Sequence, residues 1–385
     1  MRIAFITDGI SPYVVGGMQK HSASLAVNLV KAGHKIDLFH FVDKSQKIPS
    51  ATEVNNVLFN GTNSFENIFC CYFPTTLRFP GHYLLNSYRY SNWIYKSIIN
   101  EIDDFDFIYA KGFSAWKLLK YRKTFKVKIG IKFHGYEMYQ YPPNLKISLQ
   151  HFMLRPFVKW NNNKADFIFS YGSKVTEIIN NLNVPKNKVI ELPSAISRSW
   201  LREISQIKVN NKLRFLFIGR NERRKGINEI FDTLSTFNID KFYFEFHFIG
   251  PVEEKDLSIP SNIQVYFHGL VKDENEKKKI IDKSDVLVCP SYSEGMPNVI
   301  IESMARGLAI IASDVGAVSL LVDSNNGILM NTVNSTILKR SILKMLENKS
   351  KLLAMKKVSI SRIEKKYTWD VVTKELIKLI QQNLL

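Results

Sequence analysis

The sequence of 385 residues contains only three cysteines, Cys70, Cys71 and Cys289, and no C-x-x-C pair. So few thiols exclude a disulfide framework, and the missing pair argues against a zinc site. No stretch approaches the ~18 consecutive apolar residues that a membrane span needs. The first residues, Met1–Asp8, reach an acid too soon for a signal peptide. We therefore expect the protein to stay in the cytoplasm.

Acidic residues are also scarce: the sequence has 35 Asp and Glu but 53 Lys and Arg, which gives a formal net charge of +18. Residues 1–200 hold 25 basic against 13 acidic side chains, and eight basic residues but no acid lie between Phe107 and Tyr136. Such a surplus is either an ordinary solvated surface or a partner for an anionic membrane or nucleic acid. Because no zinc-finger, RRM or KH signature is present, we favour the membrane surface over nucleic acid.

The chain is too long for one core, since cores stop growing near ~250–300 residues. Apolar runs typical of buried strands occur at 3–7, 36–42, 107–110, 127–133 and 167–171, and again at 214–218, 242–249, 263–268, 286–289 and 309–312. Helix-like segments separate them, and this alternation predicts doubly wound parallel sheets. We place one domain at 1–204 and a second at 205–367, and assign the closing helix 368–385 to the first.

Two segments of the first half are unusually rich in aromatic and basic residues, namely 67–100 and 145–160. The simpler interpretation is that they are helices packed on the sheet. The alternative is a surface that dips into lipid headgroups, as basic amphipathic helices with Trp and Phe do.

The clearest functional signal is the stretch PSYSEGMPNVIIESMARG, in which a buried strand runs into a loop and a helix. Pro297 stands where the helix begins, because the missing amide of proline costs nothing there. The amides of Asn298 and Val299 then lie at a helix N-terminus, which favours phosphate. Glu294 precedes this end and Glu302 follows it, so each could accept hydrogen bonds from sugar hydroxyls. Either acid taken alone would be an ordinary surface residue.

A second signal is the sequence GRNERRKG, which begins at Gly219 directly after an apolar run. Ligands of open α/β sheets bind at the carboxyl edge of the strands. Arg220 offers a forked contact to phosphate and Lys225 a compact charge, so together they could stabilise a diphosphate leaving group. The alternative is a basic surface turn, and we expect Arg223 and Arg224 to be surface residues.

Three weaker signals come from the first half. Gly16 and Gly17 follow the first strand and let the backbone approach a ligand, although they do not form G-x-G-x-x-G. His134 stands at the carboxyl end of a predicted strand, where a histidine can serve a site but is more often structural. Asp104 and Asp106 form a D-x-D pair that more simply marks the start of the next strand. We expect no metal site.

Taken in order, these pieces resemble the retaining family-4 glycosyltransferases, and the resemblance covers nearly the whole chain. The matching segments are Gly16-Gly17-Met18-Gln19, Ala32-Gly33-His34, Phe133-His134-Gly135, Gly219-Arg220 with Lys225-Gly226, Phe267-His268-Gly269, Glu294 with Glu302, Ala305-x-Gly307 and the helix at Tyr367-Thr368-Trp369. The resemblance implies the GT-B fold, in which two Rossmann-like doubly wound parallel-sheet domains face each other across a cleft.

The resemblance also implies a role for each candidate residue. A nucleotide-sugar donor would be held mainly by the second domain, with Glu302 on the ribose hydroxyls and the backbone near Val271 on the base. The diphosphate would be held by Arg220, Lys225 and the amides of Asn298 and Val299. Glu294 would bind the donor sugar, and His134 would lie near the reacting sugar. Gly16 and Gly17 would approach the phosphates.

This implied chemistry needs no metal and no protein cofactor. Arg220 and Lys225 would neutralise the leaving diphosphate, and the departing phosphate could take the proton of the incoming hydroxyl, so that configuration is retained. The donor would be a UDP-sugar, with a GDP-sugar as the second choice. The acceptor would be a glycan or lipid-linked sugar of a bacterial surface polysaccharide such as lipopolysaccharide, O-antigen or capsule. A peripheral position on the inner face of the cell membrane would suit such an acceptor.

The sequence departs from the family in two places that bear on these expectations. Pro193-Ser194-Ala195-Ile196 replaces the usual turn between the domains, and Gln19 stands where many relatives have Glu. Two other functions remain open. A nucleotide-sugar epimerase could share the architecture, because fold does not determine function. A non-catalytic basic binding protein would agree with the charge but would leave the phosphate-binding pieces unused.

Overall fold

The computed structural model describes residues 1–385 except 77–78, 143, 238–240, 254–257 and 385. Within this part of the chain, contacts divide the protein into two compact units. The first comprises Met1–Tyr139, Asn144–Ser194 and Trp369–Leu385, and the second comprises Gln140–Pro143 and Ala195–Thr368. Each unit is an α/β domain with a parallel sheet, as the sequence predicts.

The first unit is built on a seven-stranded parallel sheet with the order β3-β2-β1-β4-β5-β6-β7. Its strands are β1 (Arg2–Ile6), β2 (Lys35–Val42), β3 (Asn67–Tyr72), β4 (Phe107–Lys111), β5 (Lys128–Lys132), β6 (Phe167–Ser170) and β7 (Val189–Glu191). The central strands are buried on both faces, which explains why they read as continuous apolar runs. The order reverses between β1 and β4, and this is the switch point where ligands of such sheets bind.

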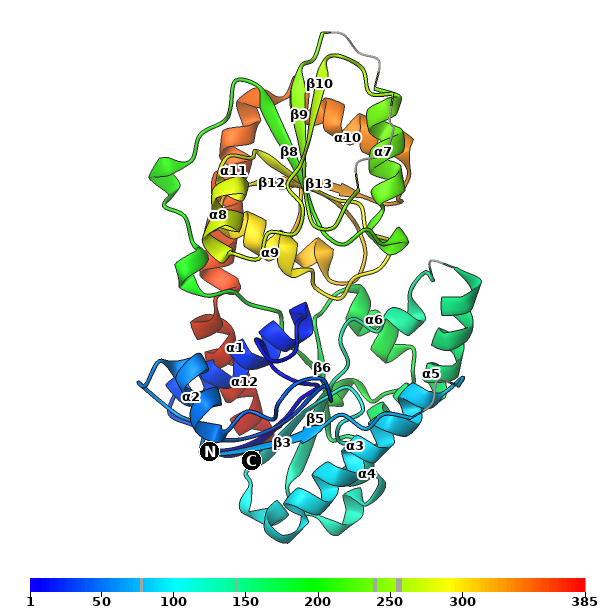
Figure 1. The fold of residues 1–385 in the computed structure, drawn as a ribbon, viewed down its shortest axis with the longest axis vertical. Helices are drawn as coiled ribbons and strands as arrows, with labels where there is room; N and C mark the ends of the chain where they lie inside the picture. Colours follow the sequence, from blue (N-terminus) through cyan, green and yellow to red (C-terminus); the bar gives the residue numbers. More distant parts are fainter. Residues whose placement is uncertain (77–78, 143, 238–240, 254–257, 385) are drawn as a thin grey trace. The chain divides into compact units, whose positions relative to one another are not determined.

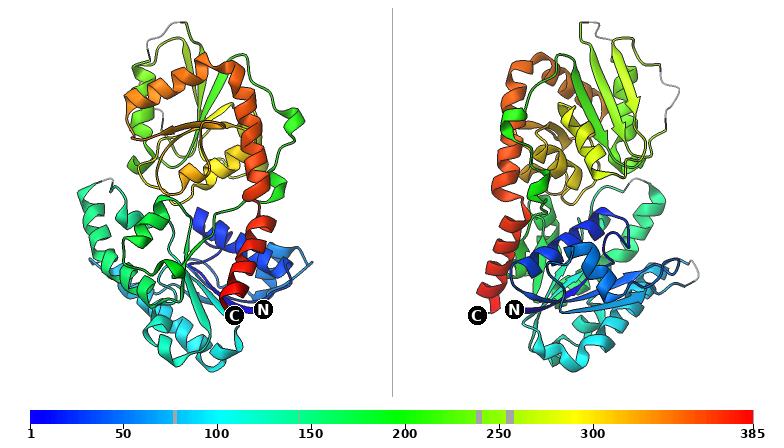
Figure 2. Two further views of the ribbon diagram at one scale, coloured as in Figure 1. Left: turned by 180° about the vertical axis from the view of Figure 1, so that it is seen from behind. Right: turned by 60° about the vertical axis from the view of Figure 1, so that its left-hand side comes forward.

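Helices cover both faces of this sheet (Figure 1). They are α1 (Gly17–Lys31), α2 (Ala51–Phe59), α3 (His82–Ile98), α4 (Trp116–Lys120), α5 (Leu145–Lys164), α6 (Lys174–Asn180) and α12 (Trp369–Leu384). Helix α12 packs against α1, while α4 packs against both α3 and α5. Figure 2 shows α12, in red, beside α1 in blue.

The second unit has a six-stranded parallel sheet with the order β10-β9-β8-β11-β12-β13. Its strands are β8 (Leu213–Ile218), β9 (Phe244–Ile249), β10 (Ile263–Phe267), β11 (Val286–Cys289), β12 (Ala309–Ser313) and β13 (Gly327–Met330). Its helices are α7 (Ile227–Ser235), α8 (Glu274–Asp282), α9 (Asn298–Ala305), α10 (Ser335–Glu347) and α11 (Lys349–Lys366). Helix α7 packs with α10 and helix α9 with α11, and the switch point lies between β8 and β11.

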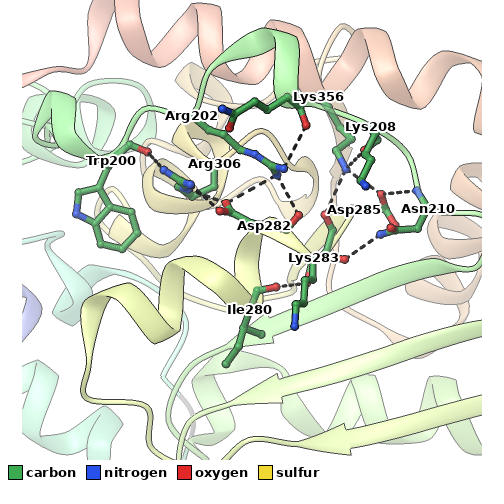
Figure 3. A network of polar contacts seen from close by, with 12 residues as sticks. Trp200, Arg202, Lys208, Asn210, Ile280, Asp282, Lys283, Asp285, Arg306 and Lys356 are labelled. Atoms are coloured by element: carbon green, nitrogen blue, oxygen red, sulfur yellow. Dashed lines mark hydrogen bonds and ion pairs between the residues drawn. The ribbon is translucent and has the colours of Figure 1, made fainter.

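A polar network ties the start of the second unit to its sheet (Figure 3). Arg306 binds both carboxylate oxygens of Asp282 at 2.7 and 2.6 Å and donates to the carbonyl of Trp200 at 3.0 Å. Lys356 of α11 contacts Asp285 at 2.8 Å, and their side chains are only 2% and 0% exposed. The network therefore holds the C-terminal end of α9, and with it the loop before β8, in a defined place.

The domain boundary differs from the one placed at 204/205, because the first unit ends at Ser194. The polar segment after it has no periodicity in the sequence, yet it packs on the second unit. Ile207 lies so close to Gly307 that a Cβ there would meet its Cδ1 at 2.5 Å, and the Arg202 amide donates to the Ala305 carbonyl at 3.0 Å. Tertiary contacts, not local pattern, decide where this segment belongs.

Three strands, β3, β7 and β13, are absent from the sequence prediction. All three lie at the edges of the sheets. β3 is half-exposed along most of its length, and β7 has only three residues. Edge strands of this kind lack the continuous apolar run that marks a buried strand.

The basic run between Phe107 and Tyr136 does not form one surface. Lys111 and Lys132 are buried at the carboxyl ends of β4 and β5, with 6% and 2% exposure. Lys126 and Lys128 are exposed at the opposite end of β5. Strand direction therefore separates charges that are close together in the sequence.

The two aromatic segments form β3 and α3 in one case and α5 in the other; residues 77–78 of the first lie outside the described part. Among the described residues, no helix has both the length and the apolar character to cross a bilayer. Helix α5 nevertheless exposes Leu145, Leu149 and Phe152 at 90%, 64% and 68%.

Candidate functional site

The best-defined polar contact at a sheet switch point joins Lys225 and Glu294 in the second unit. Lys225 follows β8 and Glu294 follows β11, so the two neighbouring strands bring them together. The Lys225 ammonium lies 2.6 Å from Glu294 Oε1, and both side chains are largely buried. A cation and an acid preset at this edge can serve a phosphate and a hydroxyl respectively.

Gly226 makes this approach possible. It has a φ of 70° in the left-handed region, and a Cβ there would lie 2.0 Å from the carbonyl oxygen of Pro290. Only glycine tolerates both the conformation and the close passage of the two chain segments. Gly226, the last residue of GRNERRKG, thus sets the position of Lys225.

The three arginines of this sequence have different environments. Arg220 is 69% exposed and binds Glu222 at 3.0 Å, so it reaches outward from the carboxyl end of β8. Arg223 contacts Glu229 at 2.8 Å. The expectation that Arg224 is a surface residue is wrong, because its side chain is only 20% exposed and lies 3.9 Å from Glu294. Arg224 is therefore a second cation beside this acid, in addition to Lys225.

Glu302 lies on α9 and is 7% exposed. Its carboxylate forms an ion pair with Lys277 of α8, and the Lys277 ammonium also lies 5.8 Å from the ring centre of Trp200. Lys277 is not predictable from the sequence, since nothing in the local pattern of α8 distinguishes it from the two lysines that follow. Glu302 and Glu294 thus each hold a different lysine.

Helix α9 starts one residue later than predicted, at Asn298, and Pro297 is its N-cap. Pro297 has an extended conformation and its carbonyl accepts the first helical hydrogen bond, from Ile300, at 3.1 Å. The amides of Asn298 and Val299 are therefore the first two of the helix, as a phosphate site at this end requires.

The loop that carries Glu294 is held from two sides that the sequence analysis did not identify. The Gln140 side chain donates to the Glu294 carbonyl at 2.7 Å and accepts from its amide at 3.1 Å. Gly316 packs so tightly that a Cβ would lie 2.2 Å from the Glu294 carbonyl oxygen. These contacts fix the backbone of Glu294. Val271 follows β10 and is half-exposed.

The first unit holds the remaining predicted residues. Gly16 and Gly17 begin α1 and are exposed. His134 follows β5, and its Nδ1 lies 2.9 Å from the Tyr171 hydroxyl, which fixes the ring at the carboxyl edge. Asp106 accepts a hydrogen bond from the Arg2 amide at 2.7 Å, so the D-x-D pair marks the start of β4. Across the described residues, no three His, Cys, Asp or Glu side chains group as metal ligands.

Two family models match the chain and together cover most of it. A model described as Glycosyltransferase Family 4 matches residues 15–200. A model described as Glycosyl transferases group 1 matches residues 212–348. The first match contains the glycines of α1 and His134, and the second contains the lysines and acids described above.

Two curated relatives share about a quarter of their aligned residues with this chain. An uncharacterized glycosyltransferase of Methanocaldococcus jannaschii is 25% identical over 290 residues, which are 72% of this chain and 71% of the relative. The N,N'-diacetylbacillosaminyl-diphospho-undecaprenol alpha-1,3-N-acetylgalactosaminyltransferase of Campylobacter jejuni is 26% identical over 58% of this chain and 59% of its own.

Solved structures share the fold. Sucrose-phosphate synthase from Thermosynechococcus elongatus superposes with a TM-score of 0.75 at 17% identity, covering 99% of this chain and 98% of its own. HepE of Anabaena, solved in complex with UDP, gives a TM-score of 0.68 at 15% identity over 99% of this chain and 100% of its own.

Proposed function

The chain belongs to the family-4, group 1 glycosyltransferases, which have the GT-B fold, and from this we propose that it is a retaining hexosyltransferase that uses a nucleotide-sugar. The acceptor in this proposal is a glycan or lipid-linked sugar of a bacterial surface polysaccharide. The relative from Campylobacter jejuni supports this class of acceptor, because its name describes transfer to a sugar on diphospho-undecaprenol.

The observation that carries the proposal is the contact between Lys225 and Glu294 at the switch point of the second sheet. On donor binding, the Lys225 ammonium turns to the diphosphate, and the Glu294 carboxylate becomes available to the hydroxyls of the donor sugar. Glu302 makes the corresponding exchange, leaving Lys277 for the ribose hydroxyls. Lys225, Glu294 and Glu302 thus each have a polar partner in both states, which avoids the cost of leaving these buried ions unpaired.

The reaction in this proposal breaks the bond between the anomeric carbon and the diphosphate. Negative charge grows on the leaving oxygen, and Arg220, Lys225 and the amides of Asn298 and Val299 stabilise it. Removing one such donor typically costs about 3–4 kcal/mol of barrier. The proton of the attacking hydroxyl passes to the departing phosphate, so we propose that no metal is needed. In this proposal, His134 lies near the reacting sugar, and the backbone of Gly16 and Gly17 approaches the phosphates.

We propose UDP as the nucleotide, with GDP as the second choice. The UDP complex of HepE supports UDP. A nucleotide-sugar epimerase remains the second candidate function, because it could share the architecture and fold does not determine function.

We also propose a peripheral position on an anionic membrane, reached through the exposed face of α5. Leu145, Leu149 and Phe152 are exposed at 90%, 64% and 68% and follow one another at helical spacing. Lys146 and Lys159 are exposed on the same helix. Apolar side chains flanked by bases suit the boundary between headgroups and acyl chains.

Calorimetry with UDP, GDP and a panel of their sugars tests the donor site. We expect one sugar nucleotide to bind the wild type, to lose at least about tenfold in affinity in Glu302→Ala, and to bind Glu347→Ala normally, because Glu347 is an exposed acid of α10. Failure of every donor to bind would contradict the proposal. Conversion of a bound donor to its epimer without acceptor, seen by NMR, would establish the epimerase instead.

A further inference from the structure

The switch point of the first sheet, between β1 and β4, also carries charged residues that the mechanism above does not use. Asp8 follows β1 and Lys111 ends β4, and Ile6 pairs with Ala110 just before them. These positions correspond to those of Lys225 and Glu294 in the second unit, which flank the switch point between β8 and β11. Each sheet therefore presents an acid and a lysine at the edge where ligands bind.

Lys111 is a buried amine whose positive charge has almost no compensating partner. Its side chain is 6% exposed, and its one hydrogen bond to a described residue, at 3.0 Å, goes to Nδ1 of His21. Burial and the neighbouring Lys111 lower the pKa of His21 well below its usual value, so the ring is neutral. No carboxylate among the described residues lies within ion-pair distance of Lys111. An ammonium has three donors, so two remain for a ligand.

Asp8 is the complementary group. Its carboxylate is half-buried and accepts no hydrogen bond within the described part of the chain. It lies over the backbone of Gly112, where a Cβ would come within 3.1 Å of its Oδ2. Desolvation raises the pKa of Asp8 to about 6, while Lys111 opposes the rise.

An exposed aromatic ring borders this pair. Tyr83 of α3 is 47% exposed, and its ring meets the ring of Phe113 edge-on with 6.3 Å between centres. Phe113 directly follows Gly112, which faces the Asp8 carboxylate. Burial and, to a smaller extent, the Asp8 carboxylate raise the pKa of the Tyr83 hydroxyl. A flat apolar ring beside a few fixed polar groups is the usual composition of a small-molecule site.

We propose that Asp8 and Lys111 bind two neighbouring hydroxyls of the acceptor sugar, and that Tyr83 packs against the face of its ring. One hydroxyl donates to the Asp8 carboxylate and the other accepts from the Lys111 ammonium. A phosphate or carboxylate ligand fits less well, because Asp8 would repel it. The inference rests on the proposed transferase function, since it assigns the acceptor to this edge.

Saturation-transfer NMR with a panel of methyl glycosides tests the site in the full chain. We expect at least one glycoside to bind the wild type and to lose about tenfold or more in affinity in Asp8→Asn and in Lys111→Met. Tyr83→Ala should weaken binding and Tyr83→Phe should restore it. The matched controls are Asp43→Asn, an exposed acid just after β2, and Lys128→Met, exposed at the start of β5.

Donor binding separates this inference from the proposed function. Asp8→Asn should still bind the sugar nucleotide that the wild type binds, and Glu302→Ala should still bind the glycoside. Equal glycoside signals in the wild type and the Asp8 variant, or no signal from any glycoside, would overturn the inference. Binding of inorganic phosphate that Lys111→Met abolishes and Asp8→Asn strengthens would also overturn it, in favour of an anion site.

Discussion

Lys225 and Glu294 come from loops 69 residues apart in the sequence, and their side chains meet at 2.6 Å. Both are largely buried, and Arg224 lies 3.9 Å from the same carboxylate. Because a buried charge is costly without a partner, each side chain of the pair compensates the other until a ligand takes its place. The proposed donor site is therefore charged and ordered before a ligand binds.

The first prediction concerns the leaving group. Lys225→Met should lower kcat by about 10²–10³-fold, because it removes one donor aimed at the developing charge. Lys351→Met, an exposed lysine of α11, should leave kcat unchanged. The measurement is the rate of nucleotide release at saturating donor and acceptor. A kcat within twofold of the wild type would show that Lys225 acts only on Glu294.

The second prediction concerns Gly226. Gly226→Ala places a Cβ 2.0 Å from the Pro290 carbonyl oxygen and also strains a φ of 70°. Gly269→Ala has similar strain, at a φ of 64°, but no atom within 4 Å of the new Cβ. Gly226→Ala should therefore lower the free energy of unfolding by about 1–3 kcal/mol more than Gly269→Ala. Denaturant unfolding measures both, and equal losses would mean that the contact with Pro290 relaxes freely.

The third prediction concerns the pH dependence of stability. Burial lowers the pKa of Lys111 to about 7, from 10.5. The buried lysine therefore lowers the free energy of unfolding as long as it is protonated in the unfolded chain. This loss of stability is complete below pH 7 and becomes smaller as the pH rises towards 10.5. Lys111→Met should raise the free energy of unfolding by about 2–4 kcal/mol at pH 7. The advantage should shrink at pH 9.5, and a constant difference would refute the titration.

The fourth prediction concerns the network that holds the start of the second unit (Figure 3). Lys356→Met leaves Asp285 buried without its cation, since the two groups lie 2.8 Å apart at 2% and 0% exposure. We expect a loss of about 3–5 kcal/mol in unfolding free energy. Lys357→Met, the next residue and exposed, is the matched control and should be neutral. An equal effect of the two variants on denaturant unfolding would count against the ion pair.

The fifth prediction concerns the membrane. Replacing Leu149 and Phe152 together by Ser should reduce sedimentation with phosphatidylglycerol vesicles by at least about tenfold, because it removes apolar side chains that would enter the lipid boundary. Val57→Ser with Tyr243→Ser, at 49% and 65% exposure on other elements, should have no effect. Equal binding of the wild type to phosphatidylcholine vesicles, or no binding to either, would refute the anionic surface.

The amino-acid sequence is enough to predict the two parallel sheets, since strands buried on both faces must be continuously apolar, as β1, β4, β8 and β11 are. It also predicts the roles of four candidate residues from the turn and helix signals next to them in the chain, namely Glu294, Glu302, Arg220 and Lys225.

Which charged side chains contact one another depends on the three-dimensional fold. Lys277 reaches Glu302 from another helix, and Asp8 and Lys111 come together because β1 and β4 are neighbours across a crossover of a hundred residues. Such pairings depend on strand order and burial, which no local pattern records. Long-range packing also decides which unit the segment after Ser194 joins and where the edge strands form, because it outweighs weak local preference.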